Sequence, residues 1–304
     1  MHQLPLFFPG AEISVIAKKG IHEVLPYFPP INHKFIFSKE EFRGIGGLIK
    51  FGKRIKRSEK FDLFFCLPDS FSAAVIAVAT GAEKRIGYKK ELRQVLLTHA
   101  YMKREGLHRV QEYVQLIELF TGSEAKNIDA ALQHQFQKGE HVVVNINSEA
   151  ASRRLTVEKA SELLDLLRSS TGREIFLIGA AKEKEFVGTV LSRLKNSSGI
   201  ENIAGKTSLC QLAEVLATAK LVLTTDSGPA HLSNALGTHT IVLFGAGKES
   251  NTAPYNKDFR NIIRLGELSC EPCEKNICVR YGIPQCLERL NSERIIETAK
   301  LHLL

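Results

Sequence analysis

Short apolar runs alternate with amphipathic helical patterns over nearly the whole chain, and this alternation limits the fold more than any other feature. Several runs are apolar on both faces, which is typical of parallel strands covered by helices on each side. The expected strands cover residues 12–19, 34–38, 62–68, 142–147, 174–180, 221–225 and 240–246. The expected helices cover residues 71–80, 107–121, 156–170, 181–195, 208–218 and 229–236. This order predicts an α/β, doubly wound architecture.

The polar stretch 121–141 interrupts this alternation and separates two sets of strands and helices. A chain of 304 residues is long enough for two domains of ordinary size. We therefore predict an N-terminal domain over 1–135 and a C-terminal domain over 136–304, with the last helix packing back on the first domain. Ligands of open α/β sheets bind at the carboxyl ends of the strands, so we expect the site in a cleft between the domains.

Basic residues are concentrated in the first half of the chain. Residues 1–135 hold 20 Lys and Arg against 14 Asp and Glu, which accounts for most of the net charge of +8. Part of this charge lies in the helix-like stretch 46–60, which is either a solvated face or a surface for an acidic partner. The candidate acidic partners are phosphorylated lipid, nucleic acid and another polyanion. Without a stacking pattern or an RNA-binding motif nucleic acid is the weaker candidate, and we expect none. The apolar runs are too short for a membrane span and there is no secretory signal, which predicts a cytoplasmic chain.

Four of the six cysteines lie near the end of the chain, at Cys270, Cys273, Cys278 and Cys286. The spacing C-x2-C-x4-C-x7-C is compatible with a structural metal site. Free thiols that only pack together are the alternative, and a reducing cytoplasm disfavours disulfides. No metal ligand set is assigned on this spacing alone.

The stretch "TTDSGPAH" places polar residues between an expected buried strand and an expected helix. Asp226 or Ser227 can cap that helix, and Pro229 suits its first turn. The free N–H groups and the dipole of a helix start also make a phosphate site, to which His231 can donate. Capping and ligand binding are both consistent with these residues. No G-x-G-x-x-G follows the first strand, and "LFGAGKES" departs from a Walker A loop at Val242 and Glu249.

With the preceding "AGKTSLCQLAEVLATAKLVLTT", this element resembles glycosyltransferase family 9, the ADP-heptose lipopolysaccharide heptosyltransferases. The segments "KFDLFFCLPDSFSAAVIAVATGAEKRIGYKKELRQVLLT" and "HRVQEYVQLIELF" are similar to the N-terminal domain of that family, and the cysteine-bearing tail is similar to its C-terminus. The similarity runs from about residue 10 to the end of the chain, with several motifs in the right order.

The resemblance implies the GT-B fold, in which two Rossmann-like domains face a central cleft. It also implies an inverting, metal-independent transfer of a heptose from ADP-heptose to the inner core of lipopolysaccharide, or to a similar lipid-linked saccharide. No cofactor is required in this family. We expect a monomer from a Gram-negative bacterium that works at the cytoplasmic face of the inner membrane.

The resemblance also implies roles for single residues in the donor domain. Asp226 would hold the hydroxyls of the donor sugar, while His231 and the backbone at Ser227, Gly228 and Pro229 would bind the diphosphate. Arg153, in the basic element that the family writes K-R-W-P, would contact the diphosphate or the sugar. The remaining expected donor contacts are Asn147 and Ser148 in the phosphate-side loop, Lys206, Thr207, Ser208 and Leu209 along the adenine, and Glu183 at the ribose.

Expected acceptor contacts lie in the other domain. Asp69 and Ser70 follow the expected strand 62–68, and Arg85, Lys89 and Arg93 form a basic group. A surface charge cluster is the alternative for the basic group.

The chain departs from the family pattern at three places. The family opens with a buried strand and a Gly-Asp loop whose Asp is the general base, and this sequence begins beyond them, which favours a truncated or mis-started chain. No catalytic base is therefore assigned, and Asp69 is the remaining candidate. A degenerate chain that binds a nucleotide sugar without turnover is the alternative function, and a nucleotide-sugar epimerase is a third.

The other two departures lie in the binding elements. Leu155-Thr156 stands where the family has Trp-Pro, and "PDSFSAA" stands where it has P-N-S-F-K-S-A, so the sugar need not be heptose.

Overall fold

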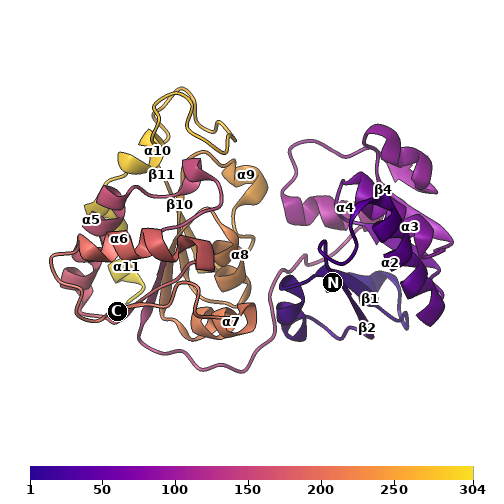
Figure 1. The fold of residues 1–304 in the computed structure, drawn as a ribbon, viewed down its shortest axis with the longest axis horizontal. Coiled ribbons are helices and arrows are strands. Elements are labelled where there is room, and N and C mark those ends of the chain that lie inside the picture. Colours follow the sequence, from indigo (N-terminus) through magenta and orange to yellow (C-terminus); the bar gives the residue numbers. More distant parts are fainter. Residues whose placement is uncertain (304) are drawn as a thin grey trace. The chain divides into compact units, whose positions relative to one another are not determined.

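The computed structural model describes residues 1–303 and divides the chain into two compact units, residues 1–129 and the part from Ala130 onward (Figure 1). Both units consist of parallel strands and helices, which confirms the predicted α/β class. Each unit has its own hydrophobic core. No helix in residues 1–303 is long and apolar enough to cross a membrane.

The second unit is built on one six-stranded parallel sheet with the order β11-β10-β9-β6-β7-β8. Its strands are β6 (Val142–Asn145), β7 (Ile175–Leu177), β8 (Ile200–Asn202), β9 (Leu221–Thr225), β10 (Thr240–Phe244) and β11 (Arg260–Arg264). The first strand, β6, pairs with β7 on one side and with β9 on the other. After β8 the chain passes back over the sheet and adds β9 on the other side of β6. This strand order is that of a dinucleotide-binding Rossmann sheet.

Helices cover both faces of this sheet. They are α5 (Val157–Thr171), α6 (Lys184–Ser192), α7 (Leu209–Thr218), α8 (Gly228–Ala235), α9 (Glu249–Thr252), α10 (Gln285–Glu288) and α11 (Ser292–Leu301). Short 3-10 turns η3 (Ala151–Arg153), η4 (Ala181–Glu183) and η5 (Lys257–Phe259) lie between them. Helix α5 packs against α6 and α11, while α7 packs against α8, which lies on β9 and β10. The expected return of the last helix to the first domain concerns the placement of the two units and stays a prediction.

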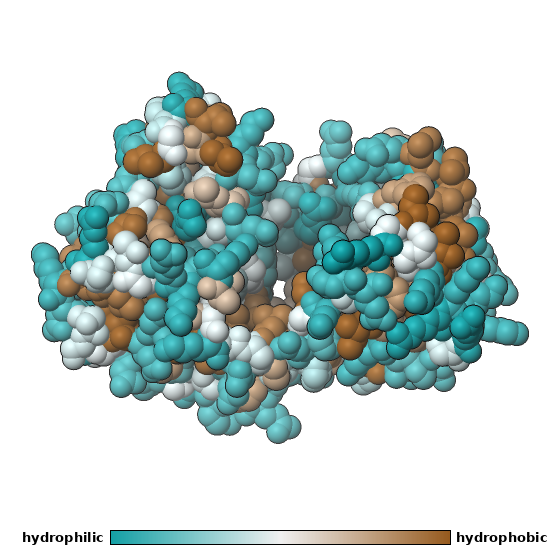
Figure 2. All heavy atoms as spheres, in the orientation of Figure 1, coloured by the Kyte–Doolittle hydropathy of each residue, from teal (hydrophilic) through white to brown (hydrophobic). Residues whose placement is uncertain are grey.

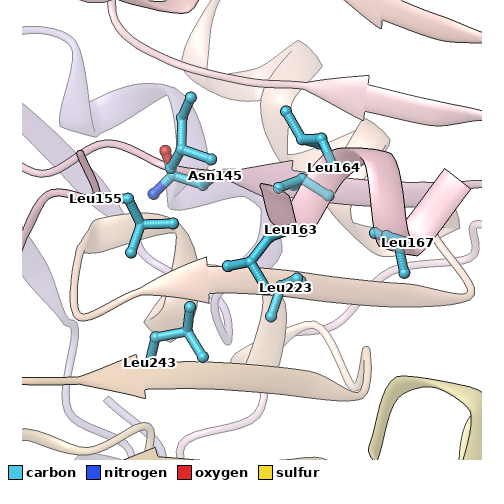
Figure 3. A pocket seen from close by; sticks show the side chains of 9 residues that line it. Asn145, Leu155, Leu163, Leu164, Leu167, Leu223 and Leu243 are labelled. Atoms are coloured by element: carbon cyan, nitrogen blue, oxygen red, sulfur yellow. The ribbon is translucent and has the colours of Figure 1, made fainter. Parts of the chain in front are cut away.

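A small interior cavity under β6 is lined almost entirely by aliphatic side chains. Figure 3 shows Leu155, Leu163 and Leu223 converging on it, with Asn145 at its edge. A cavity without polar partners does not hold ordered water. It therefore belongs to the hydrophobic core and not to a ligand site.

The first unit contains two parallel sheets, β1-β2 and β3-β4-β5, with no pairing between β1 and β3 in the described chain. Its strands are β1 (Ser14–Lys18), β2 (His33–Phe37), β3 (Leu63–Cys66), β4 (Lys84–Tyr88) and β5 (His99–Tyr101). Its helices are α1 (Leu4–Phe7), α2 (Gly44–Ser58), α3 (Phe71–Ala79) and α4 (Arg109–Thr121), with 3-10 turns η1 (Ile21–Tyr27) and η2 (Glu91–Leu96).

Alternation along β3 divides the core of this unit between two faces. Phe64 packs into a cluster with side chains of α2 and α3, and Phe35 of β2 belongs to the same cluster. Leu63 and Phe65 point to the other face, where α4 contributes Leu116. One layer of helices, α2 and α3, therefore covers strands of both sheets.

Stability should depend on pH through His302, which lies near the end of the second unit and stacks on His239. The rings of His239 and His302 stack with centroids 3.4 Å apart, and both Nε2 atoms lie within hydrogen-bond distance of Asn261 Oδ1. Burial, followed by the nearby His239, lowers the pKa of His302 below its ordinary value of 6.5. The unfolded chain therefore binds more protons near this pH, so stability present at higher pH is lost as the pH falls through the folded pKa.

We expect the melting temperature to fall more steeply on acidification in the parent than in a His302→Gln variant. Thermal unfolding followed by circular dichroism from neutral to mildly acidic pH measures both slopes. Equal slopes would contradict this role for His302.

Candidate functional site

The candidate site lies at the carboxyl ends of β6 and β9, where the strand order of the second unit reverses. Asn145, the last residue of β6, joins the two strand ends: its Nδ2 donates to Thr224 Oγ1 at 3.1 Å and to Ser227 Oγ at 2.8 Å. Thr225 Oγ1 donates to the carbonyl of Asn147 at 2.5 Å. Such a switch point is where open α/β sheets bind ligands.

Asp226 lies directly after β9 and is only 4% exposed. Arg153 Nη1, from the 3-10 turn η3, is 3.1 Å from its Oδ2. Burial raises the pKa of Asp226 above its ordinary value, while the charges of Arg153 and Arg264 favour the ionised form. The predicted Asp226 and Arg153 are thus brought together as an ion pair at the end of the sheet.

Buried polar atoms without a hydrogen-bond partner gather at this place. Among residues 1–303 there are seven such side-chain atoms, and three of them are Asn147 Oδ1, Arg153 Nε and Asp226 Oδ2. In folded proteins nearly all buried polar groups make hydrogen bonds. A group of buried polar atoms without such bonds at a strand end therefore needs an explanation. Arg153 balances the charge of Asp226 Oδ2, and a polar ligand would supply the hydrogen bonds that these three atoms lack.

Helix α8 starts beside this group with its first N–H groups uncapped by a side chain. Ser227 occupies the N-cap position but makes no side-chain cap, because its hydroxyl donates to Thr225 O at 3.1 Å. Pro229 lies in the first turn, as predicted, and Gly228 and His231 are exposed. A helix start of this kind favours an anion through its N–H groups and its dipole. The predicted capping by Ser227 is therefore wrong, and Asp226 is instead the partner of Arg153.

Two residues that the sequence analysis missed lie at this place: Gly247, in the loop after β10, and Arg264, at the end of β11. A Cβ placed on Gly247 would overlap Asp226 Oδ2 and stand 3.2 Å from Asp226 Cγ. Arg264, the last residue of β11, donates to the carbonyls of Gly245, at 2.8 Å, and Gly247. The sequence segment "LFGAGKES" could have pointed to Gly247. Its glycines do not form a Walker A loop, but they allow the backbone to approach Asp226 closely.

Further expected donor contacts lie in the loops after β6, β7 and β8. Ser148 Oγ is 3.5 Å from the carbonyl of Asp226, and Asn147 Nδ2 donates to Ile178 O at 3.1 Å. Glu183 accepts from the Ala180 N–H at 2.7 Å. Gly205, next to the predicted Lys206, donates to the carbonyl of Gly179 at 2.8 Å, so the loops that carry Glu183 and Lys206 are neighbours.

One predicted residue of this group, Ser208, has a structural role of its own. Ser208 caps α7 in a reciprocal capping box with Gln211. Thr207 and Leu209 lie on either side of it, half-buried. Leu155 and Thr156, which depart from the family pattern, are explained by packing: Leu155 is in the core, and Thr156 caps α5 and donates to Glu288 at 2.6 Å.

In the first unit, Asp69 follows β3 and is engaged by two cations. Lys103 Nζ is 2.5 Å from its Oδ2, and Arg93 Nη1 is 3.5 Å from its Oδ1. Lys103, which the sequence analysis missed, also lies 3.4 Å from Glu112. Asp69 Oδ1 and Arg93 Nε are two further buried atoms without a hydrogen-bond partner.

The other expected acceptor residues are held mainly by the backbone. Arg93 is 1% exposed and donates to Pro68 O at 2.8 Å, and Arg85 donates to Leu96 O and Ala82 O. Ser70 caps α3 by accepting from the Ala73 N–H. Lys89 is exposed at the end of β4. Their predicted contact with an acceptor is not tested by these bonds and stays a prediction.

The four clustered cysteines are free thiols in the structure, with Cys286 buried and the other three half-buried. Burial, with the nearby Glu271, Cys273 and Cys278, raises the pKa of Cys286 to about 11. Within residues 1–303 no three His, Cys, Asp or Glu side chains are arranged to hold a metal ion.

Comparison with known proteins gives consistent matches. The family model described as glycosyltransferase family 9 (heptosyltransferase) matches residues 48–283. Lipooligosaccharide heptosyltransferase 2 of Campylobacter jejuni is 26% identical over 81% of this chain and 77% of its own length. Lipopolysaccharide heptosyltransferase 2 of Escherichia coli is 25% identical over 85% and 80%. The solved E. coli ADP-heptose lipopolysaccharide heptosyltransferase II superposes with a TM-score of 0.83 at 22% identity, covering 99% of this chain and 92% of that one. This superposition confirms the predicted GT-B fold.

Proposed function

The chain belongs to glycosyltransferase family 9, the heptosyltransferases of lipopolysaccharide core synthesis, and from this premise we propose that it transfers a heptose from ADP-heptose to an inner-core lipopolysaccharide. The reaction inverts the anomeric configuration and needs no metal. The name of the superposed E. coli enzyme includes ADP-heptose, which supports this donor. The single observation that carries the proposal is the group of orphaned polar atoms around Asp226 at the start of α8.

The residues of this group suit the chemistry of the donor. Departure of a nucleoside diphosphate leaves negative charge on the leaving group and positive character on the anomeric carbon. Without a metal, the leaving charge is met by the N–H groups at the start of α8, by His231 and by Arg153. Asp226 accepts hydrogen bonds from the sugar hydroxyls, and Asn147 and Ser148 line the phosphate side. Lys206, Thr207, Ser208 and Leu209 run along the adenine, and Glu183 reaches the ribose.

The acceptor binds to the first domain, which we assign to residues 1–135, with the donor domain over 136–304. Asp69 and Ser70 follow β3, and Lys89 follows β4, at the carboxyl ends of parallel strands. Asp69 is the candidate base for the acceptor hydroxyl, and Arg93 Nη1 lies 3.5 Å from its Oδ1. Arg85, near the start of β4, is the other proposed basic contact. The protein works as a cytoplasmic monomer at the membrane face where the lipid-linked acceptor is available.

The test combines the purified protein with ADP-heptose and heptose-free inner-core lipopolysaccharide, and mass spectrometry follows the acceptor. An increase by one heptose, inverted at the anomeric carbon by NMR and unaffected by EDTA, supports the proposal. Release of free heptose without an acceptor would instead indicate a hydrolase or epimerase. Binding of ADP-heptose without any product would indicate a binding protein.

A further inference from the structure

The outer face of α2 carries more positive charge than its contacts explain. This face consists of Ile45, Ile49, Lys50, Lys53, Arg54, Lys56 and Arg57, all exposed, and is called the α2 face below. Leu48, Phe51, Gly52 and Ile55 form the opposite, buried face of the same helix. Hydrophilic residues cover the part of the first unit where Figure 1 draws α2 (Figure 2). The candidate donor site is in the other unit and uses none of these residues.

The charge on this face is hardly neutralised within the protein. Arg54 lies 3.5 Å from Glu41, and the two side chains are 72% and 58% exposed. An ion pair so exposed to water contributes little to stability. Lys50, Lys53 and Arg57 have no acidic partner within 4.0 Å in residues 1–303. Together with Glu41 and Ile49, these basic side chains line an open groove along the helix. The surface therefore presents several positively charged side chains, and few acidic side chains lie near enough to pair with them.

The orientation of the face is determined by close packing beneath it. A Cβ on Gly52 would overlap Ala79 Cβ and lie 2.9 Å from the carbonyl of Ile76, so α2 lies directly against α3. Phe51 and Ile55 are 3% and 2% exposed in the core below. The helix cannot roll about its axis without breaking these contacts. Its cations and its two isoleucines consequently remain on the surface.

We propose that the α2 face is the surface with which this protein docks on an anionic lipid bilayer; this rests on the proposed lipid-linked acceptor. A helix with basic residues and exposed aliphatic side chains on one face lies in the plane of a membrane interface. The lysines and arginines meet anionic headgroups, and Ile45 and Ile49, 59% and 37% exposed, reach toward the acyl boundary. A second copy of this chain would bring like charges together. A nucleic acid would find no aromatic side chain on this face for its bases.

The test uses sedimentation with two kinds of vesicle, phosphatidylcholine alone and phosphatidylcholine with about one quarter phosphatidylglycerol. The parent should bind the anionic vesicles and release them at high salt. The triple variant Lys50→Gln, Lys53→Gln, Arg57→Gln should bind them on the order of 100-fold more weakly. The matched control Lys195→Gln, Lys257→Gln, Lys300→Gln removes the same charge from exposed positions of the second unit. It should bind as the parent does.

Equal loss in both triple variants would overturn the proposal, since it would show that net charge alone governs binding. A parent that ignores anionic vesicles, or that binds duplex DNA as tightly as the vesicles, would overturn it as well. The outcome is separable from the proposed function, because vesicle binding needs no donor sugar. In the transfer assay, the α2 triple variant should keep its rate on detergent-dispersed acceptor and lose rate on acceptor embedded in anionic vesicles.

Discussion

Replacing Asp226 by alanine is expected to lower kcat/KM for the donor sugar by about 10–100-fold, on the order of 1.4–2.8 kcal/mol. Asp226 is buried at the end of β9, and its Oδ2 faces Arg153 without an aligned hydrogen bond. In the proposed complex, this oxygen accepts from the donor sugar. Removing it takes away that bond and also leaves Arg153 without its ion-pair partner. Steady-state kinetics with varied ADP-heptose, and calorimetry of ADP-heptose binding, measure the effect.

Two variants separate this role from a merely structural one. Asp226→Asn keeps the shape of the side chain and should fold as the parent does while still losing donor affinity. Asp258→Ala removes an exposed carboxylate from η5 of the same unit and should leave the kinetics unchanged. If Asp226→Ala and Asp226→Asn both bound and turned over the donor as the parent does, Asp226 would not belong to the site.

Gly247→Ala is expected to lower kcat/KM by about 100-fold, although the added group is a single methyl. That methyl would overlap the Asp226 carboxylate and stand 3.2 Å from the Phe244 ring. Gly247 is also held from the other side, because Arg264 donates to its carbonyl. Either the carboxylate or the loop must move, and both lie against the proposed sugar position. The loss should appear in kcat/KM with the overall fold retained by circular dichroism.

Gly188 provides the matched control for this substitution. It lies within α6 of the same unit, and a Cβ there meets nothing within 4 Å. Gly188→Ala should leave transfer unchanged and stabilise the helix slightly, because alanine has the higher helix propensity. A Gly247→Ala variant as active as Gly188→Ala would show that the loop after β10 is remote from the reaction.

Long apolar runs made much of the fold predictable. Strand β9 was predicted with its observed bounds, and β10 was predicted to begin where it does. The strands β4, β5, β8 and β11 were missed because they are short or carry charges, as "KRIGY" and "RNIIR" do, so their apolar periodicity is weak. Their place in the sheets depends on long-range pairing, which a local pattern does not contain.

The candidate site was predictable where residue chemistry coincides with a strand end. The resemblance led us to expect Asp226 and Arg153 near one ligand, and the structure brings these two residues, far apart in sequence, together as an ion pair that was not predicted. Arg264 and Gly247 were missed because their roles exist only through contacts across β10 and β11. Lys103 was missed for the same reason: β5 brings it to Asp69, 34 residues away along the chain. Such contacts follow from sheet order, which the local sequence does not state.

The central claim is that the diphosphate of an ADP-sugar binds at the start of α8 beside Asp226 and Arg153. A crystal structure of the protein soaked with ADP tests it most directly. We expect the diphosphate oxygens within hydrogen-bond distance of the backbone N–H groups at Ser227 and Gly228, with Arg153 turned toward them. A diphosphate bound elsewhere on the second unit, with the start of α8 still empty, would contradict it.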